Sequence, residues 1–158
     1  MTRIPDLGPR GEGWVVLQFL LFVAIGVVAG FAEPWDDGLA PTLRALGTLA
    51  ISAGFLLLAM AFPKLGISTT AFPKPVEHGQ LRTDGIYGLV RHPIYGGVFL
   101  LALGWSFLRG PIALVPTVAL AVLFVLKSMR EEAFLIERYP DYARYRERVR
   151  KRFIPGIV

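Results

Sequence analysis

The sequence contains no cysteine and only two histidines, His78 and His92. Without cysteine the chain has no disulfide, no thiolate nucleophile and no cysteine metal site. The two histidines do not have the H-E-x-x-H spacing of a zinc centre, so we expect no metal. There is also no P-loop, and no G-x-G-x-x-G follows a strand pattern, so a nucleotide-like cofactor would need something other than a Rossmann fold.

Charged residues are few, and long apolar runs take their place. Hydrophobic residues make up 54% of the 158 residues and the mean hydropathy is +0.53, which is high for a soluble protein. A helix that crosses a bilayer needs about 20 mostly apolar residues. The runs are continuous rather than alternating, which predicts helices and not a barrel. The predicted spans are 14–31, 43–62, 94–108 and 112–126.

The predicted fold is therefore all-α: one polytopic membrane domain over residues 1–158, with about four transmembrane helices and cytoplasmic C-terminal helices. Four spans place the N-terminus, the loop 63–92 and the tail from Lys127 on one side. Fifteen of the 17 basic residues then share that side, which the positive-inside rule makes cytoplasmic. The basic balance is thus a topology signal and not a sign of nucleic-acid binding. We expect an integral membrane protein, in the plasma membrane of a prokaryote.

Arg91 and His92 stand directly before Pro93, which opens the third apolar run. Proline disfavours helical geometry in the preceding residue and suits the first position of a helix. Arg91 and His92 should therefore lie at a helix N-terminus, where free N–H groups favour anions. With Tyr87 and Tyr95 close by, this cluster predicts a site for a polar or anionic small molecule, although His92 could instead be a structural cap. The Pro63–Pro75 stretch is interpreted as an irregular connector.

A second polar cluster extends the fourth span. Lys127 and Glu131 are four residues apart and share a helix face, so they could form an ion pair at a solvated helix end. Glu131 and Glu132 point about 100° apart, and at most one of them should face the bundle interior. Gly26-x-x-x-Gly30 predicts close helix packing within the bundle.

The tail after Pro140 has the pattern of a helix, with its aromatic face formed by Tyr142, Tyr145, Val149 and Phe153. One interpretation is an interfacial helix that turns this face to the bilayer and its arginines to anionic headgroups. The other is that the tyrosines cap a pocket near Arg91. The two are compatible.

These motifs, taken in order, resemble the isoprenylcysteine carboxyl methyltransferase family, which belongs with the phospholipid N-methyltransferases in a wider group of membrane methyltransferases. The resemblance covers residues 77–155. It rests on Gly85-x-Tyr87-x-x-x-Arg91-His92-Pro93-x-Tyr95-x-Gly97, on Glu131-Glu132-x-x-Leu135, and on Tyr142-x-x-Tyr145-x-x-x-Val149 with Ile154-Pro155.

The resemblance implies S-adenosylmethionine as the methyl donor and a lipophilic methyl acceptor from the bilayer as the substrate. Carried over by position, Glu131 would contact the amino group of the cofactor. The other implied cofactor contacts are Gly79, Gln80, Leu81, Arg82, Tyr87, His92, Pro93, Ile94 and Tyr95.

The implied catalytic residues are Arg91, Lys127 and Glu132. Family members often carry an arginine at the position of Lys127, near the carboxylate of the acceptor. Lysine keeps the positive charge but lacks the planar guanidinium that binds both oxygens of a carboxylate. The chemical class of the acceptor is therefore not fixed by the sequence. A carboxylate acceptor needs only a cation to place it. An amine or thiol would need a base, for which His92 and Glu132 are the candidates.

Two other readings are compatible with parts of the pattern. An NADPH-dependent membrane reductase of the sterol-reductase type shares an Arg-x-Pro-x-Tyr-like element, but its motif often continues with glutamate where this chain has Gly97-Val98. A non-catalytic four-helix membrane module with a basic lipid-binding tail is the third reading. It would not predict two distant polar clusters.

Overall fold

The computed structural model describes residues 5–157, and these form helices and loops with no strand. The helices are α1 (Glu12–Gly30), α2 (Ala40–Leu65), α3 (Pro93–Arg109), α4 (Leu114–Arg138) and α5 (Tyr142–Arg148), with short 3₁₀ turns η1 (Gly66–Ser68), η2 (Gly85–Gly88) and η3 (Pro111–Ala113). The predicted all-α fold class is confirmed. α2 continues through Pro63, so the connector begins later than the sequence analysis expected.

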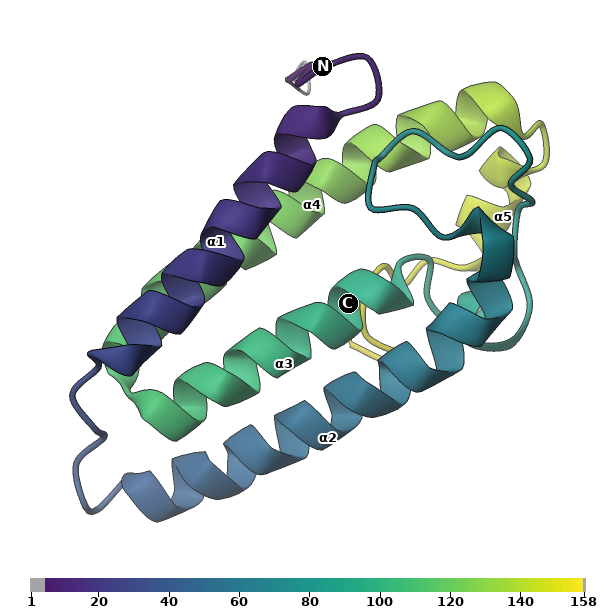
Figure 1. Cartoon of the computed structure of the whole chain (residues 1–158). Coiled ribbons are helices and arrows are strands. Elements are labelled where there is room, and N and C mark those ends of the chain that lie inside the picture. The colour runs from purple at the N-terminus through teal and green to yellow at the C-terminus, as the bar shows by residue number, and fades with distance from the viewer. Residues whose placement is uncertain (1–4, 158) are drawn as a thin grey trace.

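The long helices pack as an antiparallel bundle in which α1 lies along α4, and α3 lies between α4 and α2 (Figure 1). The connection from α2 to α3 arches past the end of α4 and meets α5 there. The two polar clusters of the sequence, separated by some 40 residues, therefore come together at one end of the bundle.

The bundle is that of an integral membrane protein. Among the described residues, three helical stretches are long and apolar enough to cross a bilayer: 12–30, 40–68 and 111–138. α3 has 17 residues, about 25 Å of helix, and is shorter than a typical hydrocarbon core of about 30 Å. The outward faces carry large apolar side chains such as Phe19, Leu49 and Val115, which suits contact with lipid tails.

Glycines set the closest helix contact, which is between α2 and α3. A Cβ added to Gly54 would lie 2.8 Å from the carbonyl oxygen of Gly97, and one added to Gly47 would lie 2.8 Å from that of Gly104. In a membrane the hydrophobic effect does not drive helices together, so they associate through close packing. Small residues such as glycine allow the two backbones to approach this closely. The prediction for Gly26-x-x-x-Gly30 was wrong, because a Cβ at either glycine would meet no atom within 4 Å.

The C-terminal segment after α5 is irregular rather than helical, with bends and turns over residues 153–157. α5 ends at Arg148, so the helix predicted to carry Phe153 stops short of it. The backbone N–H groups of Arg91 and His92, which precede α3, donate to the carbonyls of Lys151 and Arg152 at 3.1 and 2.7 Å. These donors at a helix start need acceptors, and the irregular C-terminal segment supplies them.

Candidate functional site

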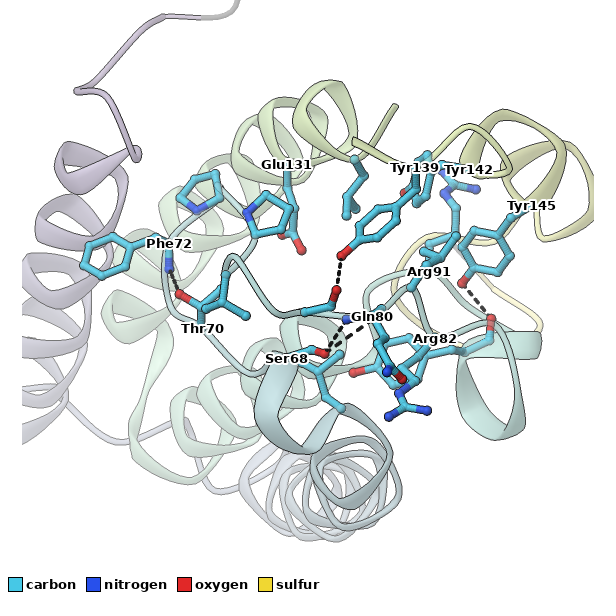
Figure 2. A pocket seen from close by; sticks show the side chains of 18 residues that line it. Ser68, Thr70, Phe72, Gln80, Arg82, Arg91, Glu131, Tyr139, Tyr142 and Tyr145 are labelled. Carbon is cyan, nitrogen blue, oxygen red and sulfur yellow. Dashed lines mark hydrogen bonds between the residues drawn. The ribbon is translucent and has the colours of Figure 1, made fainter. Parts of the chain in front are cut away.

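Two adjoining cavities lie where the connection 66–84, the start of α3, the end of α4 and α5 meet. Figure 2 shows the larger of the two. Both are lined by Leu65, Thr70, Tyr87, Arg91 and Glu131, so they form one space, which we call the polar cleft. The other lining residues of the larger cavity are Ser68, Phe72, Pro73, Pro75, Val76, Gly79, Gln80, Leu81, Arg82, Leu135, Tyr139, Tyr142 and Tyr145. The other lining residues of the smaller cavity are His92, Pro93, Ile94 and Tyr95.

The wall of the polar cleft is built by hydrogen bonds between its segments. The Tyr139 hydroxyl donates to the Gly79 carbonyl at 2.7 Å, and the Tyr145 hydroxyl donates to the Tyr87 carbonyl at 2.7 Å (Figure 2). The Gln80 N–H donates to the Ser68 hydroxyl at 2.9 Å. α4 and α5 thus hold the connecting loop in place over the cleft.

The N-terminal segment supports the same loop from the other side. The Arg10 guanidinium lies 4.4 Å from the centre of the Phe72 ring, and the Arg10 carbonyl accepts a hydrogen bond from the Lys74 N–H at 3.3 Å. Gly11 has φ +83 and lies so close to Pro73 that a Cβ would stand 2.7 Å from the proline ring. The loop is therefore clamped between the chain before α1 and the end of α4.

Three buried donors of the polar cleft have no partner among the described residues: the Arg82 Nε–H and the hydroxyls of Tyr87 and Tyr142. Leaving a buried donor unsatisfied costs about 1–3 kcal/mol. Burial raises the pKa of the Tyr87 phenol, with a further contribution from the Glu131 carboxylate, and burial likewise raises the pKa of the Tyr142 phenol. Both phenols therefore stay protonated and can donate to a ligand in the cleft.

A buried ion network lies beneath the cleft. The Arg91 Nε donates to Glu132 at 2.9 Å, and the His92 Nε2 lies 3.1 Å from the same carboxylate oxygen. The Arg91 Nη1 donates to the carbonyls of Val149 and Arg150 at 2.6 and 2.7 Å. Most of the donors of Arg91 are used in these contacts, so the network ties the start of α3 to α4 and to the C-terminal segment.

Tyr95 occupies the centre of the site. Its hydroxyl donates to Glu131 at 2.6 Å, and its ring stacks with those of His92 and Phe124, whose centroids are 5.5 and 4.9 Å away. Both glutamates thus contact the start of α3: Glu132 is buried, while the Glu131 side chain is 27% exposed. As expected, only one of the two glutamates is buried in the bundle, and the partly exposed Glu131 meets Tyr95, which lies one helical turn beyond His92.

An apolar cavity of about 200 Å³ lies on the other side of Tyr95, between α3, α4 and the C-terminal segment. Its lining contains almost no polar surface. Tyr95 therefore separates a polar space from an apolar one. The residues that line the apolar cavity are Tyr95, Phe99, Ala121, Phe124, Val125, Phe153 and Ile154.

Lys127 is fully buried in the seam between α4 and α1. Its ammonium donates to the Gln18 amide oxygen at 2.5 Å and lies 5.2 Å from the centre of the Tyr95 ring. No carboxylate of residues 5–157 lies within the 4.0 Å of an ion pair, so the predicted pair with Glu131 is not formed. Lys127 and Glu132 line neither part of the polar cleft.

All ten residues expected to contact the cofactor line the polar cleft: Gly79, Gln80, Leu81, Arg82, Tyr87, His92, Pro93, Ile94, Tyr95 and Glu131. No sequence pattern pointed to Thr70, Phe72 and Tyr139 on the same wall, or to Gln18 beside Lys127. Tyr142 and Tyr145 are buried and line the cleft, as the interpretation of a pocket cap near Arg91 expects.

The family model for phospholipid methyltransferases matches residues 42–142, from α2 into the start of α5. The chain belongs to the phospholipid methyltransferase family. It is 35% identical over 108 residues to the protein-S-isoprenylcysteine O-methyltransferase of Schizosaccharomyces pombe, which covers 66% of this chain and 46% of the relative. These matches confirm the resemblance to the isoprenylcysteine carboxyl methyltransferases.

A second relative belongs to another class of enzyme. The Delta(14)-sterol reductase of Methylotuvimicrobium alcaliphilum is 31% identical over 88 residues, which cover 53% of this chain and 21% of the reductase. The chain thus spans less than half the length of the curated relatives that it matches. α1 lies before the part that the family model matches.

Proposed function

We propose that the protein is an S-adenosylmethionine-dependent methyltransferase that acts on a lipophilic acceptor taken from the bilayer. The observation that carries the proposal is the meeting of two unlike spaces at Tyr95. One is the polar cleft with its three unpartnered buried donors, and the other is the apolar cavity of about 200 Å³. A water-soluble donor and a lipid-tailed acceptor need such a pair of spaces with a shared boundary.

The residues of the polar cleft fit S-adenosylmethionine. That cofactor would supply an electrophilic methyl group on a sulfonium. Arg82, Tyr87 and Tyr142 offer donors to its carboxylate, hydroxyl and ring nitrogen atoms. The Glu131 carboxylate and the aromatic rings suit its cationic amino and sulfonium groups. The buried wall excludes water, which would otherwise compete for the methyl group.

We propose a carboxylate as the acceptor, because it needs only a cation to place it and Lys127 is a buried cation beside Tyr95. An amine or thiol acceptor would need a base to remove its proton. Glu132 accepts hydrogen bonds from Arg91 and His92, and both of these side chains are fixed by it. Glu132 is therefore engaged in the network, and the Nδ1 atom of His92, 3.7 Å from Glu131, is the remaining candidate base. Arg91 and Glu132 act in this proposal as positioning residues. Lys127, a buried cation beside Tyr95, is left to place an anionic acceptor.

For the orientation, we propose that the polar cleft opens to the cytoplasm and that both termini lie there. The connection 63–92 and the part of the chain from Lys127 onward supply most of the lining of the cleft, and together they carry 13 of the 17 basic residues. The positive-inside rule assigns such segments to the cytoplasmic face. This is the side from which a soluble cofactor reaches the cleft.

The match to a sterol reductase supports NADPH-dependent reduction as a second candidate. A dinucleotide phosphate carries several negative charges, and the cleft presents the Glu131 carboxylate with Arg91 already committed to Glu132. Calorimetry on the detergent-purified chain separates the two functions. Binding of S-adenosylhomocysteine, and methyl transfer from labelled S-adenosylmethionine to farnesylthiopropanoic acid, support the methyltransferase. Binding of NADPH alone would overturn it.

A further inference from the structure

We infer that α5 and the residues directly after it form a binding surface for the headgroups of anionic phospholipids, and that bound headgroups hold α5 against the polar cleft. Headgroup binding does not depend on the activity of the protein, whereas its consequence for the cofactor rests on the proposed methyltransferase function. We call this surface the basic strip. Its exposed members are Arg144, Arg146, Arg148, Arg150 and Lys151.

The basic strip carries positive charge that the protein does not neutralise. Residues 141–152 contain six basic residues but only two acidic ones. Among the described residues, the basic side chains of this stretch that have a carboxylate within 4.0 Å are Arg146 and Arg152, and both share Glu132. The other cations repel each other, and negative charge from outside the chain would relieve that repulsion.

α5 keeps this charge on a different side from the cleft. Tyr142 and Tyr145 are buried and line the cleft, and the Tyr145 hydroxyl donates to the Tyr87 carbonyl at 2.7 Å. Arg144 and Arg148 are four residues apart, so they share another face of the helix, and both are exposed. One helix of seven residues therefore has an aromatic side against the cleft and a cationic side open to a partner.

The residues that follow fix the level of the basic strip in the membrane. Phe153 and Ile154 line the apolar cavity together with Phe99 of α3 and Val125 of α4, which belong to apolar runs of these helices. Three residues of chain reach at most about 10 Å, so Arg150 lies within that distance of Phe153. The headgroup layer on each side of the hydrocarbon core is about 5–8 Å thick. The C-terminal end of the basic strip therefore lies at the level of the headgroups.

Exposed apolar side chains flank the basic strip on two segments. Leu89 before α3 is 58% exposed and Ile157 after the strip is 68% exposed. The N–H groups of Arg91 and His92 connect the two segments through hydrogen bonds to the C-terminal carbonyls. Apolar side chains beside arginines suit a membrane surface, where the apolar groups enter the acyl region and the cations contact anionic headgroups. A soluble acidic partner would match the charge alone.

Bound headgroups should also act on the polar cleft, because α5 forms part of its wall. A helix of seven residues has little stability by itself, so the position of α5 depends on its contacts. The unpartnered hydroxyl of Tyr142 is offered to the cleft only while α5 lies there. Headgroups on one side of α5 and the cofactor on the other favour the same position, so each should raise the affinity for the other.

Spin-labelled phospholipids test the surface, with the full chain in phosphatidylcholine nanodiscs and the motionally restricted fraction of the label as the readout. The parent should select phosphatidylglycerol over phosphatidylcholine. Each basic residue near an anionic surface strengthens the attraction by up to about fivefold, so Arg144→Gln combined with Arg148→Gln should lower this selectivity about fivefold or more. Arg144→Lys combined with Arg148→Lys keeps the charge and should keep the selectivity. Equal selectivity in the parent and the glutamine pair would overturn the surface.

Hydrogen–deuterium exchange tests the effect on α5. Amide exchange in residues 142–148 of the parent should slow about fivefold when phosphatidylglycerol replaces part of the phosphatidylcholine, and the glutamine pair should show no such change. Exchange that is equal in both bilayers would overturn the effect on α5. Inorganic phosphate added to phosphatidylcholine nanodiscs should not slow exchange, and an equal effect of phosphate would overturn a lipid surface in favour of a site for a free anion.

The affinity for S-adenosylhomocysteine separates the lipid surface from the proposed function. For the parent it should be about fivefold higher in nanodiscs that contain phosphatidylglycerol, and for the glutamine pair it should be the same in both bilayers. Equal affinities for the parent would overturn the link to the cofactor. Absence of binding in every bilayer would overturn the proposed function, while the spin-labelled lipids would still decide the headgroup surface.

Discussion

The Arg91 guanidinium and the Glu132 carboxylate, 41 residues apart in the sequence, meet at 2.9 Å with side chains only 6% and 5% exposed. Arg91 also donates to two carbonyls of the C-terminal segment, which carries Phe153 to the wall of the apolar cavity. One buried pair therefore fixes three segments, and through them it shapes both spaces of the proposed site.

Glu132→Ala should destabilise the fold more than it alters chemistry directly. Removing one partner of a buried pair leaves the other charge uncompensated and costs about 3–5 kcal/mol. We expect a clearly lower midpoint of thermal unfolding in detergent for Glu132→Ala. Glu131→Ala removes a carboxylate that is partly exposed and should shift the midpoint much less. Equal midpoints for the two variants would contradict the positioning role of Glu132.

Glu131→Ala should instead weaken the cofactor. The Glu131 carboxylate lines the polar cleft and is held by the Tyr95 hydroxyl at 2.6 Å. Losing a hydrogen bond to a charged group costs about 1.5–3 kcal/mol, which corresponds to an increase of about ten- to a hundredfold in the Kd for S-adenosylhomocysteine. Glu137→Ala, an exposed glutamate of the same helix, is the control. Calorimetry measures both, and an unaltered Kd in Glu131→Ala would remove Glu131 from the site.

The convergence at Tyr95 could be predicted because its causes are local. Pro93 fixes the start of α3, and the polar residues after the fourth apolar run mark where α4 leaves the membrane. A hairpin of two adjacent helices then brings Tyr95 and Glu131 to the same end of the bundle. The spacing of the motifs follows from this arrangement of the helices. The expected cofactor contacts therefore all line one cleft.

The features that were missed depend on contacts that no local pattern records. Gln18 is one polar residue in an apolar run, and its partner lies 109 positions away. Phe153 fits a helical period, but the carbonyls of the two residues before it accept hydrogen bonds from the N–H groups of Arg91 and His92, and its segment is not helical. Gly54 packs against Gly97, whereas the more conspicuous Gly26-x-x-x-Gly30 packs against no other helix. The packing glycines are seven residues apart in α2 (Gly47 and Gly54) and in α3 (Gly97 and Gly104). This spacing indicates a contact only once the two helices are known to pair.

The proposed orientation predicts where impermeant thiol reagents can react. The chain has no cysteine, so single cysteines can be introduced without a background. Asp37→Cys in the loop between α1 and α2 should be labelled from outside intact cells. Thr69→Cys and Glu147→Cys, both exposed and next to the cleft, should be labelled only after the membrane is permeabilised. Labelling of Glu147→Cys in intact cells would reverse the assignment of the cleft to the cytoplasm.

Lys127→Met is expected to keep or raise the thermal stability of the protein and to lower its turnover. Methionine fills nearly the same volume without a charge, and replacing a buried charge with an apolar side chain is often neutral or stabilising. We therefore expect a thermal midpoint equal to or above that of the parent, and an unaltered Kd for S-adenosylhomocysteine. Turnover of farnesylthiopropanoic acid should fall by about a hundredfold, because the carboxylate is no longer held in line with the donor.

Lys127→Arg completes the comparison. It keeps the charge and adds a planar fork, so it should retain acid turnover where the larger head fits beside Gln18. Two results for Lys127→Met bear on the acceptor. A stable variant with lost turnover shows that the buried charge is kept for the substrate and not for the fold. Full turnover in the same variant would contradict a carboxylate held at Lys127, and would turn attention to an acceptor that carries no negative charge.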